Sequence, residues 1–223
     1  MHAEIFLNIW HLITRLGEAQ IVLPAAALTV SALLVRSSTR RLALSWLLLI
    51  TAAALITTAS KVAFIGWGIG WAAVDFTGVS GHAMFAAAVY PMLMLAMVAD
   101  RLPSRYRFAS FALGCALALA VGLSRIAVGA HSWSEVVAGL LVGGAVSAAA
   151  LVVAKSATLT RRPLVSAAVF AWLAAAPFQL QALQTHALVT RLAVTMSGNA
   201  APFRRSELAR RLRRIHLTAH PGA

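Results

Sequence analysis

Long apolar runs that contain almost no charged side chains recur along this chain, and they constrain its fold more than any other feature. They cover approximately residues 19–35, 42–60, 80–99, 108–123, 135–154 and 163–183. A helix of about 17–25 apolar residues crosses the roughly 30 Å hydrocarbon core of a bilayer. Only 11% of the residues are charged, whereas about a quarter are charged in ordinary soluble domains. The sequence therefore predicts an all-α fold, a polytopic membrane helical bundle of about six transmembrane helices.

The two ends of the chain differ from the apolar runs. Residues 1–17 alternate apolar and polar side chains at helical spacing, which predicts an amphipathic helix lying in the membrane interface. A poorly formed extra span is the alternative. Residues 186–223 form a basic tail, in which 203–217 is typical of an amphipathic helix that binds anionic lipid headgroups. Residues 18–185 between these ends are predicted to form one transmembrane domain.

The positive charge is distributed unevenly over the loops. Segments 36–41, 100–107 and 155–162 each carry three basic residues, and they alternate with loops that carry few. The positive-inside rule places these three segments in the cytoplasm, so the other loops face outward. Six spans would also put the basic tail outside, against the same rule, and the sequence leaves its side open. No soluble basic domain is present, so the net charge of +13 does not indicate nucleic-acid binding.

Polar residues of unusual character gather in the outward loops, at the ends of successive runs. They are Lys61, Asp75, Ser80, His82, Arg125, His131 and Glu135, and Gly81 lies between two of them. A helix that begins at Ser80 would direct free N–H groups outward, and such an end attracts phosphate. Lysine and arginine cations would add to this attraction, since a guanidinium can hold two phosphoryl oxygens. The cluster therefore predicts a phosphate-binding site.

Two histidines in one phosphate site can divide the chemistry between them. One can attack phosphorus while the other protonates the leaving oxygen. His131 and Glu135 are four residues apart, so one helical turn can bring the carboxylate to the imidazole and hold its tautomer. Simpler interpretations remain: Ser132 and Glu135 fit a capping box, and Ser80 fits a plain N-cap. Asp75 has no assigned role beyond a pairing with Arg125 or Lys61.

Two stretches carry a resemblance to a known family. Ser80-Gly81-His82, followed by Ser124-Arg125, His131 and Glu135, resembles the second and third signatures of the type 2 phosphatidic acid phosphatase (PAP2) superfamily, written PSGH and SRxxxxxHxxxD. The hydropathy favours its membrane lipid phosphatase branch. The resemblance implies that His131 becomes a phosphohistidine, that Glu135 orients it and that His82 is the general acid. It assigns Lys61, Ser80, Gly81 and Arg125 to phosphate binding, and it implies no metal or other cofactor.

Three positions depart from the family's pattern. The first signature, KxxxxxxRP, is represented by Lys61, but Gly68 and Ile69 stand where the arginine and proline belong. Glu135 replaces an aspartate, and Val79 replaces the proline of PSGH. Loss of one electrostatic stabiliser costs on the order of 10²–10³ in rate, so the resemblance predicts a weakened or specialised enzyme.

The expected function is a lipid phosphatase of the bacterial inner membrane, with its site facing the periplasm. Its substrate would be a lipid phosphomonoester or diphosphate, such as undecaprenyl diphosphate, phosphatidylglycerophosphate or phosphatidic acid. A lipid-phosphate phosphotransferase and a non-catalytic phospholipid-binding protein are the alternatives, and a metal site of His82, His131 and Glu135 is a third. The sequence names neither the lipid nor the oligomeric state.

Overall fold

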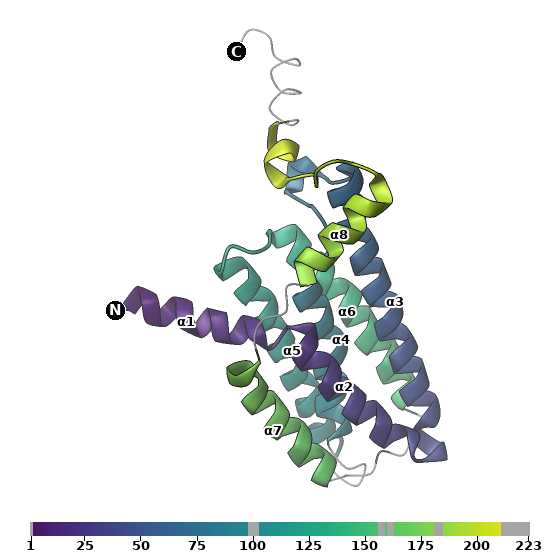
Figure 1. Ribbon diagram of the computed structural model, residues 1–223. Coiled ribbons are helices and arrows are strands. Elements are labelled where there is room, and N and C mark those ends of the chain that lie inside the picture. The colour runs from purple at the N-terminus through teal and green to yellow at the C-terminus, as the bar shows by residue number, and fades with distance from the viewer. Residues whose placement is uncertain (1, 98–102, 156–158, 160–162, 181–184, 211–223) are drawn as a thin grey trace.

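The structure is a computed structural model that describes residues 2–97, 103–155, 159, 163–180 and 185–210. Within these residues the chain is helical and contains no strand. In chain order the elements are α1 (His2–Arg15), α2 (Ala19–Leu34), α3 (Ser37–Trp67), the 3₁₀ turn η1 (Ala72–Val74), α4 (Gly81–Ala96), α5 (Ser104–Ala127), α6 (Trp133–Ala154), α7 (Pro163–Gln179) and α8 (Thr185–Ser197). The predicted all-α fold is confirmed, and Figure 1 shows a bundle from which α1 projects.

Some helices of the bundle are long enough to span a membrane. In the described part of the chain, α3, α5 and α6 are long and apolar enough to cross a bilayer. The C-terminal part of α1 and α2, joined at a 41° bend, meet the same criterion as a pair. Helices α4 and α7 are apolar but only 16 and 17 residues long. The protein is therefore a helical membrane protein, and the count of six spans stays a prediction.

Helix α4 forms the centre of the bundle. It is apolar all round, and 12 of its 16 residues are buried, as expected for a helix enclosed by others. Helix α6 approaches α4 closely at Gly139 and Gly143. A Cβ atom on Gly139 would lie 2.6 Å from the Ser80 carbonyl oxygen, and a Cβ atom on Gly143 would collide with the Met84 carbonyl oxygen. Gly139 and Gly143 form a GxxxG pair, in which small residues let two helix backbones approach closely.

Two helix boundaries differ from the prediction in a way that affects the site. The second span was expected to stop at Lys61, but α3 continues to Trp67 and ends where Gly68 adopts a left-handed backbone (φ +68°). A charge near a helix end does not terminate a helix, whereas glycine accepts this conformation readily. Likewise α5 extends past its expected end at residue 123, so Arg125 lies on its last turn.

The C-terminal region also differs from the expected tail. Residues 185–197 form α8, which packs against the last turns of α3, and Ala193 is fully buried there. The chain then returns over the end of α3, and residues 205–210 are helical. Leu208, expected to face lipid, is 5% exposed and packs against Phe64 and Ile65. The remainder of the predicted amphipathic helix, residues 211–217, lies outside the described residues.

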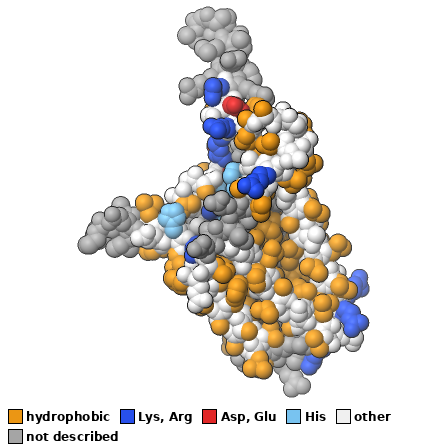
Figure 2. All heavy atoms as spheres, in the orientation of Figure 1, with side chains coloured by type: hydrophobic (Ala, Val, Ile, Leu, Met, Phe, Trp, Pro, Cys, Tyr) orange, Lys and Arg blue, Asp and Glu red, His pale blue; other side chains and the backbone are white. Residues whose placement is uncertain are grey.

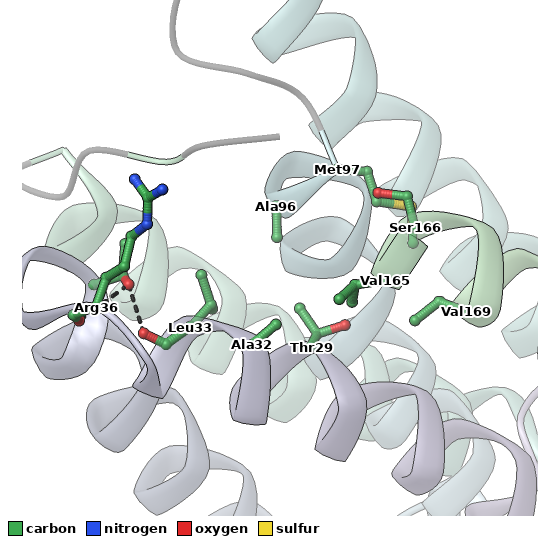
Figure 3. Close-up of a pocket in the computed structure, with 10 residues that line it drawn as sticks. Thr29, Ala32, Leu33, Arg36, Ala96, Met97, Val165, Ser166 and Val169 are labelled. Carbon is green, nitrogen blue, oxygen red and sulfur yellow. Dashed lines mark hydrogen bonds between the residues drawn. The ribbon is translucent and has the colours of Figure 1, made fainter. Parts of the chain in front are cut away.

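A small cavity marks one end of the bundle, which we call the basic end. This cavity, of about 30 Å³, lies where α2 and α4 finish and where α3 and α7 begin (Figure 3). That volume holds little more than one water molecule. Arg36 lies on the connection that joins α2 to α3 at this end, and Arg40 and Arg41 lie in the first turns of α3. Figure 2 shows basic side chains near the bottom of the bundle and again near the C-terminal segment, with apolar side chains covering much of the surface between them.

Candidate active site

A second, much larger cavity opens at the other end of the bundle, which we call the site end. Its volume is about 810 Å³. Of the residues selected from sequence, Lys61, Gly81, His82, Arg125 and His131 line it. They come from the last turns of α3 and α5, the first turn of α4, and the loop before α6. The structure thus brings together residues that are up to 70 positions apart in the sequence.

Glu135 and His131 form the best-defined contact of the site. His131 Nδ1 lies 2.7 Å from Glu135 Oε2, across one turn as predicted. The Glu135 side chain is fully buried, and a buried carboxylate is stable only when it is hydrogen-bonded or paired. With Nδ1 donating its proton to the carboxylate, the free electron pair of the imidazole is on Nε2. This is the tautomer that a nucleophilic histidine requires.

The predicted capping box is present as well, so Glu135 has two roles. The Glu135 carboxylate accepts from the Ser132 N–H at 3.2 Å, and Ser132 Oγ accepts from the Glu135 N–H. The capping interpretation is therefore confirmed, and the contact that the orienting interpretation requires is also present. The cap fixes the start of α6, and the same carboxylate holds the His131 ring.

The second oxygen of Glu135 has partners that the sequence did not indicate. Oε1 accepts from the Thr77 backbone N–H at 2.9 Å and from the Thr77 hydroxyl. It also accepts from Arg205 Nη2 at 2.7 Å. Thr77 lies three residues before Ser80, so proximity to the second signature could have suggested it. Arg205 lies 70 residues beyond Glu135 in a segment expected to bind lipid, and no local pattern could have pointed to it.

Asp75 pairs with neither of the cations expected for it. Its Oδ2 accepts from Arg205 Nη1 at 2.7 Å, on the rim of the site, where its side chain is 53% exposed. The expected pairing with Arg125 or Lys61 is wrong because the returning C-terminal segment brings a closer guanidinium. Arg125 instead donates from Nη1 to Thr14 Oγ1 of α1 at 2.8 Å.

Three buried polar atoms in or beside the cavity wall have no hydrogen-bond partner among the described residues: Thr57 Oγ1, Ser80 Oγ and Arg125 Nε. Ser80 occupies the N-cap position of α4 as predicted, but its side chain makes no capping hydrogen bond. Its backbone N–H donates to the Glu135 carbonyl oxygen at 3.0 Å, which fixes α4 against α6. Buried polar groups are nearly always paired. These three donors therefore fit an anionic ligand held beside the first turn of α4.

His131 lies in the loop before α6, and its surroundings favour the neutral imidazole. Burial lowers the pKa of His131, and the Lys61 and Arg125 cations lower it further, whereas the hydrogen bond to Glu135 opposes the shift. The group therefore remains uncharged at neutral pH. Neutral Nε2 keeps the electron pair with which it can attack phosphorus.

Metal binding is a different use of the same side chains. Within the described residues, no three His, Cys, Asp or Glu side chains are close enough to share a metal ion. Both oxygens of Glu135 already accept hydrogen bonds. The donor set does not fit the metal site of His82, His131 and Glu135 that the sequence left open.

Comparison with known proteins agrees with this geometry. Residues 42–159, just over half of the chain, match the sequence model of the PAP2 superfamily. A Klebsiella pneumoniae protein described as "Uncharacterized 22.5 kDa protein in cps region" is 37% identical over 203 residues, which cover 89% of this chain and 97% of that protein. No solved structure matches the chain. The matched residues include Lys61, His82, Arg125 and His131, which line one cavity, and the chain belongs to the PAP2 superfamily.

Proposed function

We propose that this protein is a cofactor-independent lipid phosphatase that works through a phosphohistidine at His131. The observation that carries the proposal is the His131–Glu135 pair at 2.7 Å, in a cavity shared with His82, Lys61 and Arg125. Family membership supports phosphatase chemistry in general. The geometry supplies a nucleophile with a defined tautomer, a second imidazole and cations in one place.

The proposed reaction has two steps. His131 Nε2 attacks phosphorus, the bond from phosphorus to the lipid oxygen breaks, and His82 gives a proton to that oxygen. Water then attacks the phosphohistidine, the P–N bond breaks, and His82 recovers a proton from the water. Lys61, Arg125 and the first turn of α4 stabilise the charge on the phosphoryl oxygens throughout.

A lipid substrate is favoured by the mixed lining of the cavity. Beside the charged groups it is lined by apolar side chains of α3 and α4, including Ala54, Phe64, Ile65, Met84 and Phe85. The headgroup would lie among the cations while the acyl or prenyl chain extends along this apolar wall. Undecaprenyl diphosphate, phosphatidylglycerophosphate and phosphatidic acid all have this division of polarity.

The proposed location is the cytoplasmic (inner) membrane of a bacterium, with the site on the periplasmic side. The support is that the basic connection before α3 lies at the end of the bundle opposite the large cavity. A cysteine placed at the partly exposed residue Ser134, in a Cys115→Ser background, should react with a membrane-impermeant maleimide in spheroplasts. Reaction only after permeabilisation would reverse this orientation.

The decisive experiment is phosphate release from a panel of lipid phosphates by purified protein in detergent. His131→Ala should lower the rate by several orders of magnitude because it removes the nucleophile. His11→Ala is the matched control, since His11 is exposed on α1 and outside the cavity. Activity that survives His131→Ala would refute the assigned role. Transfer of phosphate to a lipid acceptor instead of water would identify a phosphotransferase. Lipid binding without turnover would identify a non-catalytic lipid-binding protein.

A further inference from the structure

Arg205 reaches the active site from the C-terminal segment, well beyond the residues that match the family. Its Nη2 contacts Glu135 Oε1 at 2.7 Å and Thr77 Oγ1 at 3.2 Å, and its Nη1 contacts Asp75 at 2.7 Å. It lines the same cavity as Lys61 and Arg125. The site therefore contains a cation that neither the signatures nor the tail's composition assigned to it.

The segment that carries Arg205 is fixed against the end of α3. The Phe203 N–H donates to the Ile65 carbonyl oxygen at 2.8 Å, and the Phe203 ring packs edge-on against Phe64 with centroids 6.0 Å apart. One turn later, Leu208 is buried in a small cluster with Val62 and Ile65. Asn199 also donates from its side chain to the Gly66 carbonyl oxygen. Arg205 lies between two anchored positions, so its place at the cavity is set by the backbone.

Gly68 and Phe203 fit together in a way that connects this segment to the missing first-signature arginine. A Cβ at position 68 would lie 2.8 Å from the Phe203 ring, and the backbone there has φ +68°. No larger side chain fits at position 68 while Phe203 is in place. The aromatic ring occupies the space above the end of α3, and the next residues bring Arg204 and Arg205 to the cavity.

We propose that Arg205 is a phosphate-binding residue of this active site and supplies the cation that position 68 lacks. This inference rests on the proposed phosphatase function. In the structure the guanidinium forms ion pairs with Glu135 and Asp75. Its pair with Asp75 is weak because both side chains are about half exposed. A phosphoryl oxygen replaces Asp75 on Nη1, while Nη2 stays on Glu135 and keeps that carboxylate oriented toward His131. A guanidinium has two terminal nitrogens that both carry N–H groups, so it can contact the phosphoryl oxygen and Glu135 at the same time.

The test compares Arg205→Ala, Arg205→Lys and the control Arg210→Ala, all as full-length protein in detergent. Arg210 is exposed on the next turn of the same helical segment, so its loss removes the same charge without touching the cavity. Orthovanadate binding is measured by titration calorimetry, and phosphate release is measured on the best lipid of the panel. We expect Arg205→Ala to weaken vanadate binding and to lower kcat/KM by about 10²–10³-fold, the usual effect of losing one electrostatic stabiliser. Arg205→Lys should recover part of both, and Arg210→Ala should match the wild type.

Two results would overturn the inference. Wild-type vanadate affinity in Arg205→Ala together with reduced turnover would show that the guanidinium acts only through Glu135. Wild-type behaviour in both measurements would remove Arg205 from the site altogether. Either result is separate from failure of the proposed function, which is tested by His131→Ala alone. Thermal unfolding of each variant, and the intermediate behaviour expected of Arg205→Lys, distinguish loss of binding from loss of fold.

Discussion

Replacing Glu135 by glutamine tests how the carboxylate controls His131. The fully buried side chain accepts hydrogen bonds at both oxygens: from Thr77 and Arg205 at Oε1, and from His131 and Ser132 at Oε2. An amide has one accepting end and one donating end. At Oε1 its NH₂ group would face donors from Thr77 and Arg205, and each buried unsatisfied donor costs about 1–3 kcal/mol. The NH₂ group should therefore take the Oε2 position.

This arrangement inverts the His131 tautomer. Nδ1 must then accept from the amide, so the proton moves to Nε2 and the electron pair that attacks phosphorus is lost. An equivalent change in a serine protease triad lowers kcat by about 10⁴-fold, which corresponds to about 5.5 kcal/mol at 1.36 kcal/mol per tenfold change. We expect a loss of this order for Glu135→Gln in the phosphate-release assay.

The control is the same substitution at Glu207, which contacts the Arg204 N–H and not His131. Thermal unfolding in detergent should show that Glu135→Gln remains folded, because the amide keeps the size of the side chain. If this variant kept more than about a tenth of wild-type activity, where a loss of about 10⁴-fold is expected, the tautomer argument would be wrong. His131 would then be oriented by some other group.

The remaining predictions concern pH and packing. The acid limb of the kcat/KM profile should have its midpoint below about 6.5, the ordinary value for histidine, because burial and nearby cations lower the pKa of His131 and only the neutral form attacks. Lys61→Met removes one of those cations, so the midpoint should move to higher pH, whereas Lys155→Met near the basic end should leave it unchanged; a midpoint shifted downward would contradict the assignment. Gly143→Ala should destabilise the protein by about 1–3 kcal/mol, as overpacking does, because its Cβ would collide with the Met84 carbonyl oxygen of α4. Gly144→Ala is the matched control, since nothing lies within 4 Å of a Cβ there, and equal unfolding temperatures for the two variants would contradict the packing argument.

Sequence alone determined the helical membrane fold, the division of the loops into basic and polar sets, and most of the site. These features follow from local rules: hydrophobic run length, the charge of short loops and the four-residue spacing of His131 and Glu135. The GxxxG pair in α6 could also be predicted, because small residues at that spacing let two backbones approach. Each of these inferences uses residues that are neighbours along the chain or along one helix.

Only the tertiary structure decided what completes the site. Arg205 pairs with Asp75 and donates to the second oxygen of Glu135, and the Phe203 ring fills the space above Gly68. Both residues lie more than 60 positions further along the chain than the residues they contact. The composition of this segment predicted that it binds lipid. It could not indicate the packing against α3, because a basic amphipathic pattern is the same whether its apolar face contacts a membrane or the end of a helix. Which of these surfaces the segment contacts is decided by the packing of α8 against α3 and by the left-handed turn that ends α3.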